Sequence, residues 1–322
     1  MSTVLPVSAR GGARASREAG MIDAVIAGAG PGGLSAALCL GRAGRQTLVL
    51  DGGPWRNVSS GELHNFFSRD GIPPADLRAA ALAQLRRYPM VKVEAGPAAW
   101  AEGEPGRFGV TLSDGRVIQA RRLLLATGVE DVLPDIPGLP ERWGQGVVHC
   151  PYCHGWERVG LTAGVLAMNE WSVPQAVHVA RFSDEVTLYT NGGFPLTTEQ
   201  QDLLKSRQVA VREERIARLD GAGAALERLI FTDGSTATCQ ALFCHAPTRQ
   251  RSDLAARLGC RLLDDGAVEV NEFAQTTRPG VFAIGDMART VALPFTPRQV
   301  IMAAAQGTVA AVVIDQELLY ND

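Results

Sequence analysis

The stretch Gly28-Ala29-Gly30-Pro31-Gly32-Gly33 decides the fold. It follows the apolar run Ile22–Ala27 and has glycine at its first, third and sixth positions. Such glycines permit a tight turn, a close approach of the backbone to a pyrophosphate and close helix–strand packing, while the helix N-terminus attracts phosphate. Asp51 ends the next apolar run, where a carboxylate can accept a hydrogen bond from a ribose hydroxyl. The pattern predicts a βαβ dinucleotide site made by Gly28, Gly30, Pro31, Gly32, Gly33 and Asp51.

Composition narrows the class of partner. The chain has 322 residues, a formal net charge of -3, 46% hydrophobic residues and 20% charged residues, which suits two ordinary domains. No basic excess is available for nucleic acid phosphates or an anionic membrane surface. No uninterrupted apolar run approaches the roughly 20 residues of a spanning helix. Residues 1–20 lack the apolar stretch of a signal peptide, so we expect a mobile tail, a cytoplasmic protein and a small-molecule or protein partner.

The order of patterns along the chain predicts an α/β fold in which one Rossmann-like domain is inserted into another. A proline-rich segment at 133–140 suits a linker, and a second α/β block follows it. After His245 the chain returns to the first pattern and ends in a long apolar helix. We expect a discontinuous first domain at 21–132 and 246–322, with the inserted domain at 141–245.

Two later turns change the expected ligand from a dinucleotide in general to a flavin. Ala126-Thr127-Gly128 and Gly285-Asp286 each follow an apolar strand, and Arg298-Gln299 opens the last helix. In this order the motifs resemble those of the two-dinucleotide-binding-domain flavoproteins, from about Met21 to the C-terminus. The resemblance implies that FAD is bound, that Asp286 contacts its ribityl or phosphate end, and that Arg298 and Gln299 lie near the isoalloxazine ring. Ala126, Thr127, Gly128 and Gly285 would line the same cofactor.

A cysteine pair begins the inserted block, in the segment His149-Cys150-Pro151-Tyr152-Cys153-His154-Gly155. Two thiols separated by two residues can close a local disulfide, and nearby charges can lower the pKa of one of them. Zinc is the competing interpretation, because two cysteines and two histidines lie within six residues. We expect no metal, since a tetrahedral site usually needs a second, distant ligand pair and the adjacent side chains of His149 and Cys150 should point apart. We expect the other four cysteines to be buried apolar side chains.

The position of the pair resembles that in thioredoxin reductases, where Asp-Gly follows the second cysteine. Here His154-Gly155 stands in that place. The resemblance implies that His154 takes over proton transfer, because an imidazole titrates near neutral pH. The alternative is that His154 only caps the following helix. A role for His149 in the chemistry is open on the same evidence.

The glycine fingerprint of a nicotinamide site is missing from the inserted domain. The corresponding stretch contains Met168, Glu170 and Trp171, which add bulk and a negative charge where a pyrophosphate would lie. Residues 189–192 hold no arginine for a 2'-phosphate. The alternative is a divergent nucleotide site that still works.

These features together resemble the thioredoxin-reductase-like dithiol oxidases that close disulfides in natural products such as gliotoxin, holomycin and romidepsin-type depsipeptides. The resemblance implies a homodimer that oxidises a small-molecule dithiol, with electrons passing through Cys150 and Cys153 to FAD and then to dioxygen. Cys150 would be the exchanging thiol and Cys153 the flavin-facing one. Two rivals are a thioredoxin-disulfide reductase driven by NADPH or another donor, and a non-catalytic redox sensor that holds FAD.

Overall fold

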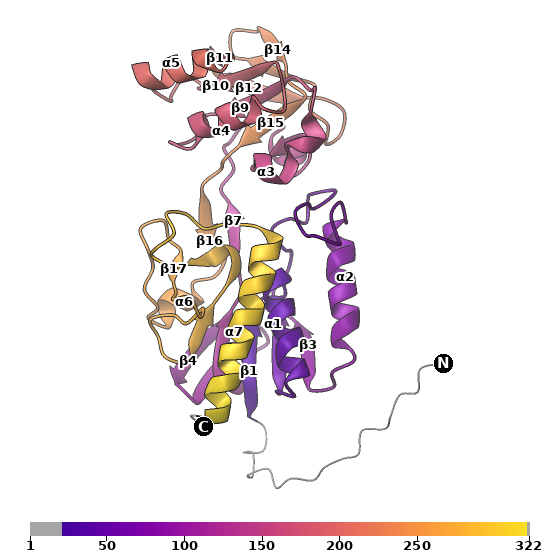
Figure 1. Cartoon of the computed structure of the whole chain (residues 1–322), viewed down its shortest axis with the longest axis vertical. Coiled ribbons are helices and arrows are strands. Elements are labelled where there is room, and N and C mark those ends of the chain that lie inside the picture. The colour runs from indigo at the N-terminus through magenta and orange to yellow at the C-terminus, as the bar shows by residue number, and fades with distance from the viewer. Residues whose placement is uncertain (1–20, 321–322) are drawn as a thin grey trace, which may run out of the picture.

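The computed structural model describes residues 21–320, so the predicted tail at 1–20 lies outside the described residues. Two α/β units are stacked end to end and joined by a narrow waist (Figure 1). Two antiparallel strands form this waist, β7 (Val129–Asp131) and β16 (Thr248–Gln250). The chain crosses the waist once in each direction, which makes the upper unit an insertion in the lower one.

The lower unit is built on a seven-stranded sheet with the order β3-β2-β1-β6-β5-β4, in which β18 also pairs with β6. Strands β1, β2, β3, β6 and β18 run parallel, and β4 and β5 form antiparallel pairs. The bounds are β1 Ile22–Ala27, β2 Thr47–Asp51, β3 Val91–Ala95, β4 Ala98–Glu104, β5 Arg107–Leu112, β6 Val117–Leu125 and β18 Val281–Ala283. The central strands are apolar on both faces because each face is covered.

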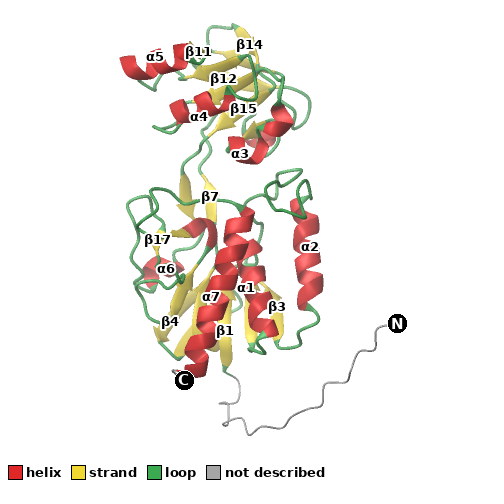
Figure 2. Ribbon diagram, in the orientation of Figure 1, coloured by secondary structure: helices red, strands yellow, loops and turns green. Residues whose placement is uncertain are grey.

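Three helices lie on one face of this sheet, as Figure 2 shows. They are α1 (Pro31–Arg42), α2 (Pro74–Leu85) and α7 (Val300–Tyr320). Helix α1 begins directly after the glycine turn, with Pro31 at its first position, where proline's missing N–H costs nothing. Helix α7 packs so closely on α1 that a Cβ at Gly307 would lie 2.2 Å from the Gly32 carbonyl oxygen. The long C-terminal helix therefore packs directly against the helix that begins at the glycine turn.

By length and composition alone, α7 could span a membrane. The most apolar 18-residue stretch of the helix has a mean hydropathy of 1.2, and 28% of that stretch is buried inside the protein. Its last turns nevertheless carry charged residues that are paired within the domain. Asp315 accepts from Arg45 at 2.6 Å, and Glu317 accepts from Arg122 at 2.7 Å. These ion pairs and the contact with α1 make α7 a covering helix of the lower sheet.

The upper unit has a five-stranded parallel sheet with the order β11-β10-β9-β15-β8. Its bounds are β8 Val147–Val148, β9 Ala163–Leu166, β10 Val186–Tyr189, β11 Val209–Arg212 and β15 Ala241–Cys244, with helices α4 Ser172–Val179 and α5 Thr198–Ser206. A small antiparallel sheet is added, made of β12 Ile216–Asp220, β13 Arg228–Phe231 and β14 Thr236–Thr238. The parallel strands at the centre of the lower sheet and the parallel upper sheet confirm the predicted α/β class with two Rossmann-like units.

Short elements complete the chain. The four-residue helix α3 (Pro151–His154) carries the cysteine pair and lies on the underside of the upper unit, facing the lower one (Figure 1). The remaining elements are η1 Pro140–Arg142, η2 Trp156–Arg158, α6 Leu254–Arg257, β17 Val268–Glu269, η3 Gly285–Met287 and β19 Ala288–Arg289.

Candidate functional site

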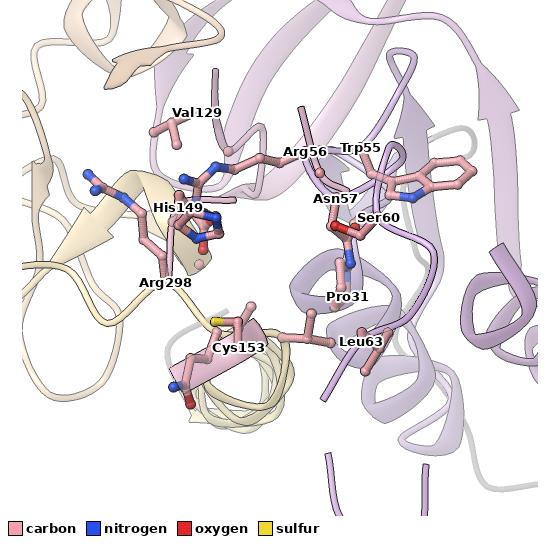
Figure 3. A pocket seen from close by; sticks show the side chains of 18 of the residues that line it. Pro31, Trp55, Arg56, Asn57, Ser60, Leu63, Val129, His149, Cys153 and Arg298 are labelled. Carbon is pink, nitrogen blue, oxygen red and sulfur yellow. Dashed lines mark hydrogen bonds and ion pairs between the residues drawn. The ribbon is translucent and has the colours of Figure 1, made fainter. Parts of the chain in front are cut away.

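One pocket joins the two units and gathers most of the site residues expected from the sequence. Figure 3 shows part of its lining, with side chains from both units converging on one space. Of the expected residues, the lining includes Gly30, Pro31, Gly32, Ala126, Thr127, Gly128, Gly285, Asp286, Arg298, Gln299, His149, Cys153 and His154. The fold thus places the second cysteine, both histidines and the cofactor turns around one cavity.

Gly28 and Gly33 lie outside the pocket lining and shape the turn beneath it. A Cβ on Gly28 would lie 2.1 Å from the carbonyl oxygen of Ala126, and the φ of Gly28 is +119°. A Cβ on Gly33 would lie 2.0 Å from the carbonyl oxygen of Gly28. Only glycine fits these two positions, because the turn, the helix and the Ala126 turn approach one another backbone to backbone.

Asp51 and Cys150 also lie outside the lining. The Asp51 carboxylate forms an ion pair with Arg78 of α2, and Arg78 also donates to the carbonyl of Ala29 at 2.8 Å. The acid expected to bind a ribose hydroxyl is therefore already held by an arginine that sequence reasoning did not identify. Cys150 is the N-cap residue of α3.

The chemistry of the lining fits FAD. A Cβ on Gly30 would meet no atom within 4 Å, so the turn leaves space there for a ligand against the backbone. The side-chain nitrogens Trp55 Nε1 and Arg298 Nε line the same pocket and are buried without a hydrogen-bond partner among the described residues. Open space over a helix N-terminus, with unpaired donors nearby, suits a long anionic cofactor.

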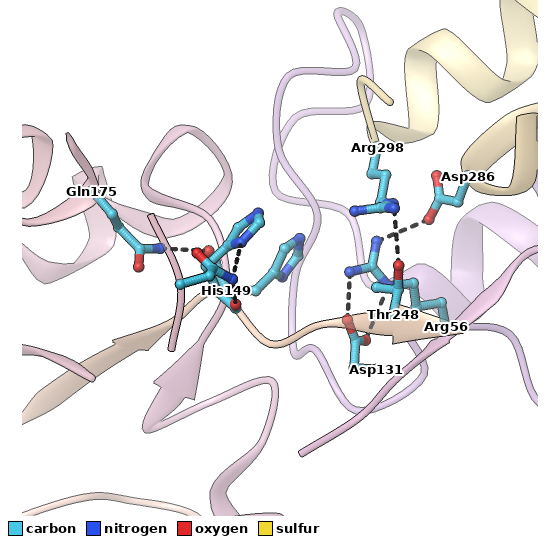
Figure 4. A network of polar contacts seen from close by, with 9 residues as sticks. Arg56, Asp131, His149, Gln175, Thr248, Asp286 and Arg298 are labelled. Atoms are coloured by element: carbon cyan, nitrogen blue, oxygen red, sulfur yellow. Dashed lines mark hydrogen bonds and ion pairs between the residues drawn. The ribbon is translucent and has the colours of Figure 1, made fainter. Parts of the chain in front are cut away.

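Arg56 is a pocket residue that sequence reasoning missed. It donates to Asp131 at 2.6 and 3.0 Å and to Asp286 at 2.9 Å, as Figure 4 shows. Burial alone would lower the pKa of Arg56, but its bonds to these two carboxylates raise it. Asp286 therefore faces the pocket as part of an ion-paired network. Arg56 lies in an irregular loop with no motif, so no sequence signal pointed to it.

Arg298 belongs to the same positive wall of the pocket. Its Nη2 donates to Thr248 Oγ1 at 2.9 Å, which ties the start of α7 to the waist strand β16. Burial and the neighbouring Arg56 lower the pKa of Arg298. Two guanidinium groups side by side are costly unless anions compensate them, and here Asp131 and Asp286 do so.

The cysteine pair is held by the first turn of α3. Cys150 is the N-cap residue and Pro151 the first helical residue, which brings Cys153 back toward Cys150. Both are free thiols in this structure. The hydrogen bond from Cys153 lowers the pKa of Cys150 despite burial, with help from the backbone N–H groups of Cys153 and Tyr152. The same bond, together with burial, raises the pKa of Cys153. When the pair is reduced, Cys150 is the thiol that ionises first.

The expectation that His149 and Cys150 point apart is wrong. The ligand atoms of His149, Cys150 and Cys153 all lie within 4.8 Å of one another. The short helix turns the chain back after Cys150, so neighbouring side chains can reach one centre. The three side chains are close enough together to hold a metal ion. The direction of the His149 and Cys150 side chains is therefore no argument against a metal site.

His154 is buried at the end of α3, with 9% of its surface exposed. Burial, with smaller effects from Arg158 and His64, lowers its pKa to about 4. The following helix η2 has Gly155 as its N-cap and no side-chain cap bond, so the alternative role of His154 as a cap is wrong. A neutral imidazole facing the pocket beside Cys153 is able to accept a proton.

His149 is held through its backbone, because its carbonyl accepts from Gln175 Nε2 at 2.7 Å (Figure 4). Its ring lies 6.3 Å from that of Trp143. Burial, aided by Arg56, brings the pKa of His149 well below its ordinary value. His149 therefore contributes a neutral imidazole to the pocket.

The turn after β9, where a nicotinamide dinucleotide would bind, is filled by its own side chains. Ser172 Oγ accepts from the N–H groups of Met168 and Asn169 at 2.9 and 3.3 Å, and Asn169 Oδ1 accepts from the N–H of Trp171 at 3.1 Å. The Trp171 ring packs edge-on against Phe295 of the lower unit at 5.9 Å. The donors that would hold a pyrophosphate are already satisfied within the turn.

One basic residue does lie near the second expected nucleotide position. The side chain of Arg215, from the connection between β11 and β12, packs against Gly192, where a Cβ would lie 2.8 Å from its Cγ. The stretch 189–192 itself has no arginine, but the fold supplies one from elsewhere in the chain. Tertiary structure thus adds a positive charge that local sequence reading did not find.

Comparisons with known proteins agree with this geometry. Residues 22–307 match the family described as "Pyridine nucleotide-disulphide oxidoreductase". The chain is 39% identical over 280 residues to "Thioredoxin reductase tcpT" of Claviceps purpurea, covering 83% of this chain and 86% of that protein. It is 32% identical over 316 residues to "Thioredoxin reductase aclD" of Aspergillus oryzae, covering 94% of this chain and 98% of that protein.

Solved structures show the same similarity. An oxidoreductase from Agrobacterium tumefaciens superimposes with a TM-score of 0.86 at 35% identity, covering 94% of this chain and all of that one. The crystal structure of HlmI also gives a TM-score of 0.86 at 35% identity, with 95% of each chain covered. Together with Cys153 in the lining of the cofactor pocket, these matches show that the chain belongs to the pyridine nucleotide-disulphide oxidoreductase family, as an FAD-dependent thiol/disulfide oxidoreductase of the thioredoxin-reductase type.

Proposed function

We propose that the protein is a dithiol oxidase, which closes a disulfide in a small-molecule dithiol such as a natural product. One observation carries the proposal: Cys153 and His154 line the cofactor pocket, while the turn that would bind a nicotinamide dinucleotide is closed by Ser172 and Asn169. A flavoprotein of this type that lacks a nicotinamide donor can take its electrons from the dithiol itself.

The chain's own residues supply thiol exchange and proton transfer. His154 takes the proton of one substrate thiol, and the thiolate attacks Cys150 Sγ, which breaks the Cys150–Cys153 disulfide. The proton passes to Cys153, whose raised pKa favours the thiol. The second substrate thiol then loses its proton to His154 and attacks the sulfur bound to Cys150. The substrate leaves as a disulfide and Cys150 as a thiolate, the form that its lowered pKa favours.

Several residues would hold FAD. The glycine turn with Gly30 and Gly32 lies at the N-terminus of α1, and Asp286, Arg298 and Trp55 lie along the pocket wall. FAD bound there would supply a two-electron acceptor for the reduced cysteine pair, and we propose dioxygen as the terminal acceptor. Arg56 holds Asp286 in place at that wall.

A second candidate is an NADPH-driven thioredoxin reductase. It is favoured by the names of the relatives, which are thioredoxin reductases, and by Arg215, which lies beside Gly192 where a 2'-phosphate would need a positive charge. The two functions differ in which compound delivers electrons. Oxygen uptake by the purified flavoprotein with a generic dithiol, without and with NADPH, separates them. Uptake that needs only the dithiol supports the oxidase, whereas oxidation of NADPH coupled to thioredoxin reduction contradicts it.

We also propose a cytoplasmic homodimer, as in the resembling flavoproteins, without a nucleic acid or membrane partner. The outer face of α7 is consistent with a second copy, because Val309, Val312 and Leu319 are 40%, 48% and 57% exposed. Light scattering after gel filtration measures the mass directly, and a monomer at micromolar concentration would contradict the dimer.

A further inference from the structure

Another histidine, His64, lies beside His154 in the pocket lining. His64 comes from the loop between β2 and α2 in the lower unit, and its side chain is 14% exposed. Its ring centroid is 6.5 Å from that of His154, and the two rings are almost perpendicular. Both side chains line the same pocket as Cys153. The fold therefore brings two imidazoles from different units to the pocket that Cys153 lines.

Three carboxylates surround His64. Its Nε2 lies 3.4 Å from Glu157 Oε1 and 3.6 Å from Glu62 Oε2, and its Nδ1 lies 3.5 Å from Asp70 Oδ2. The Asp70 and Glu62 side chains are 67% and 59% exposed, so they reach solvent. Hydrogen bonds from the backbone N–H of Asn65 and from His64 lower the pKa of Asp70, which keeps it charged. Both ring nitrogens of His64 therefore lie within 3.6 Å of a carboxylate oxygen on a solvent-exposed side chain.

The surroundings of His154 are different. No carboxylate contributes to its pKa shift; burial, Arg158 and His64 all act to lower it. Arg158 Nη1 also donates to the His154 carbonyl at 3.4 Å, which keeps a positive charge close by. The protonated form of His154 is therefore unfavourable, so a proton that His154 takes from a thiol must be transferred to another group on its way to solvent. The next imidazole along the pocket wall is His64, whose Nε2 is buried and makes no hydrogen bond with the described residues, so no existing bond has to break before it takes part in proton transfer.

We propose that His64 receives the proton from His154 and passes it, through the cluster of Glu62, Asp70 and Glu157, to solvent. His64 does not touch the reacting sulfur atoms and acts through His154. The inference rests on the proposed dithiol oxidation and adds the path by which the proton leaves.

In the reductive half-reaction, one of the two substrate protons must leave the site. A substrate dithiol carries two S–H protons and gives up two electrons when its own S–S bond forms. The Cys150–Cys153 bond breaks and takes both electrons. One proton stays on Cys153, Cys150 is left as a thiolate, and the second proton must reach bulk water. That second proton is the one assigned to His64.

The test measures proton release directly. Oxidised holoenzyme is mixed anaerobically with excess dithiothreitol in weak buffer containing a pH-indicator dye, and protein thiols are counted in quenched samples by mass after alkylation. We expect His64→Gln to slow proton release and thiol formation about 10- to 100-fold at pH 7, within the usual range for proton-transfer groups. Adding about 50 mM imidazole should restore most of the rate, because a free base then replaces the missing one.

The matched control is His178→Gln, since His178 contacts Tyr152 at 4.4 Å and lies outside the carboxylate cluster. It should behave as wild type with and without imidazole. If His64→Gln loses FAD or fails to fold, Asp70→Asn at the exposed end of the cluster replaces it, with a smaller slowing of about threefold that imidazole again relieves. A wild-type rate in weak buffer, or a slow rate that imidazole does not change, would overturn the inference. If dithiothreitol fails to reduce the pair in wild type, the proposed function itself fails instead.

Discussion

Asn65 Nδ2 donates a 2.8 Å hydrogen bond to the backbone carbonyl of Tyr152, between the two cysteines. The bond joins the loop after β2 in the lower unit to α3 in the upper one, so it sets how the cysteine pair meets the cofactor pocket. Its partners are 87 residues apart in the sequence. A contact of this kind positions the reacting sulfur atoms without touching them.

Removing this bond should slow the reduction of FAD by a dithiol. Asn65→Ala deletes a neutral hydrogen bond worth about 1 kcal/mol, so we expect a loss of about fivefold in the rate with unchanged FAD content. Asn65→Asp is the matched variant, because its carboxylate has the same shape but cannot donate to a carbonyl. Anaerobic stopped-flow absorbance measures both. Wild-type rates in both variants would show that the contact does not position α3.

The two cysteines should be essential for turnover but not for cofactor binding. Cys150→Ser and Cys153→Ser should each abolish dithiol-dependent oxygen uptake and leave the FAD absorbance intact. Cys153→Ser given a small symmetric disulfide should also keep half of it as a mixed disulfide on Cys150, visible as added mass, because Cys150 attacks the disulfide, releases one thiol, and has no second cysteine to resolve the new bond. Cys39→Ser, at a thiol of α1 whose pKa is raised by burial, is the control and should keep full activity. Full activity in either active-site variant would place the electron path elsewhere.

A side chain at Gly30 should exclude FAD. Gly30→Val would project atoms into the open space over the N-terminus of α1, and we expect a colourless protein with the wild-type far-ultraviolet circular dichroism. Gly193→Val is the control, since a Cβ there also meets nothing and the position lies far from the pocket. Retention of FAD by Gly30→Val would show that the pyrophosphate does not lie against this turn.

NADPH should neither bind tightly nor bleach the flavin. The reason is the turn at 167–171, whose N–H groups are held by Ser172 and Asn169 and whose Trp171 packs on Phe295. Anaerobic mixing with NADPH should leave the flavin absorbance unchanged over minutes, while a dithiol bleaches the same sample and so proves the flavin competent. Rapid bleaching by NADPH would favour the thioredoxin reductase.

His154 should act as a base across the neutral range. Because burial lowers its pKa to about 4, the imidazole is neutral at pH 6–8 and becomes protonated only as the pH falls toward 4. Protonation of His154 should therefore not lower the wild-type rate at any pH above about 5. His154→Ala should lower the rate about 100- to 10,000-fold at pH 7, and higher pH should recover part of it as substrate thiols ionise unaided. An unchanged pH–rate profile in His154→Ala would remove this role.

The local features of the fold could be predicted from the sequence because short motifs encode backbone conformation. Gly28 and Gly33 specify a turn that other residues cannot adopt, and Cys-x-x-Cys places two thiols within reach whatever surrounds them. Alternating apolar runs and helical patterns likewise predicted the order of elements through both units. Even there, the relative direction of His149 and Cys150 was predicted wrongly, because α3 turns the chain back within a few residues.

By itself, then, the sequence determined the two Rossmann-like units, the flavin turns and the redox pair, since each depends on neighbours a few residues apart. Only the tertiary structure decided which distant groups complete the site. Arg56 meets Asp286 across 230 positions, Arg78 holds Asp51, and His64 reaches His154 from the other unit. These residues lie in an irregular loop or on a helix without a motif, so no periodicity marks them. Their partners are set by the packing of one unit against the other, which no local pattern encodes.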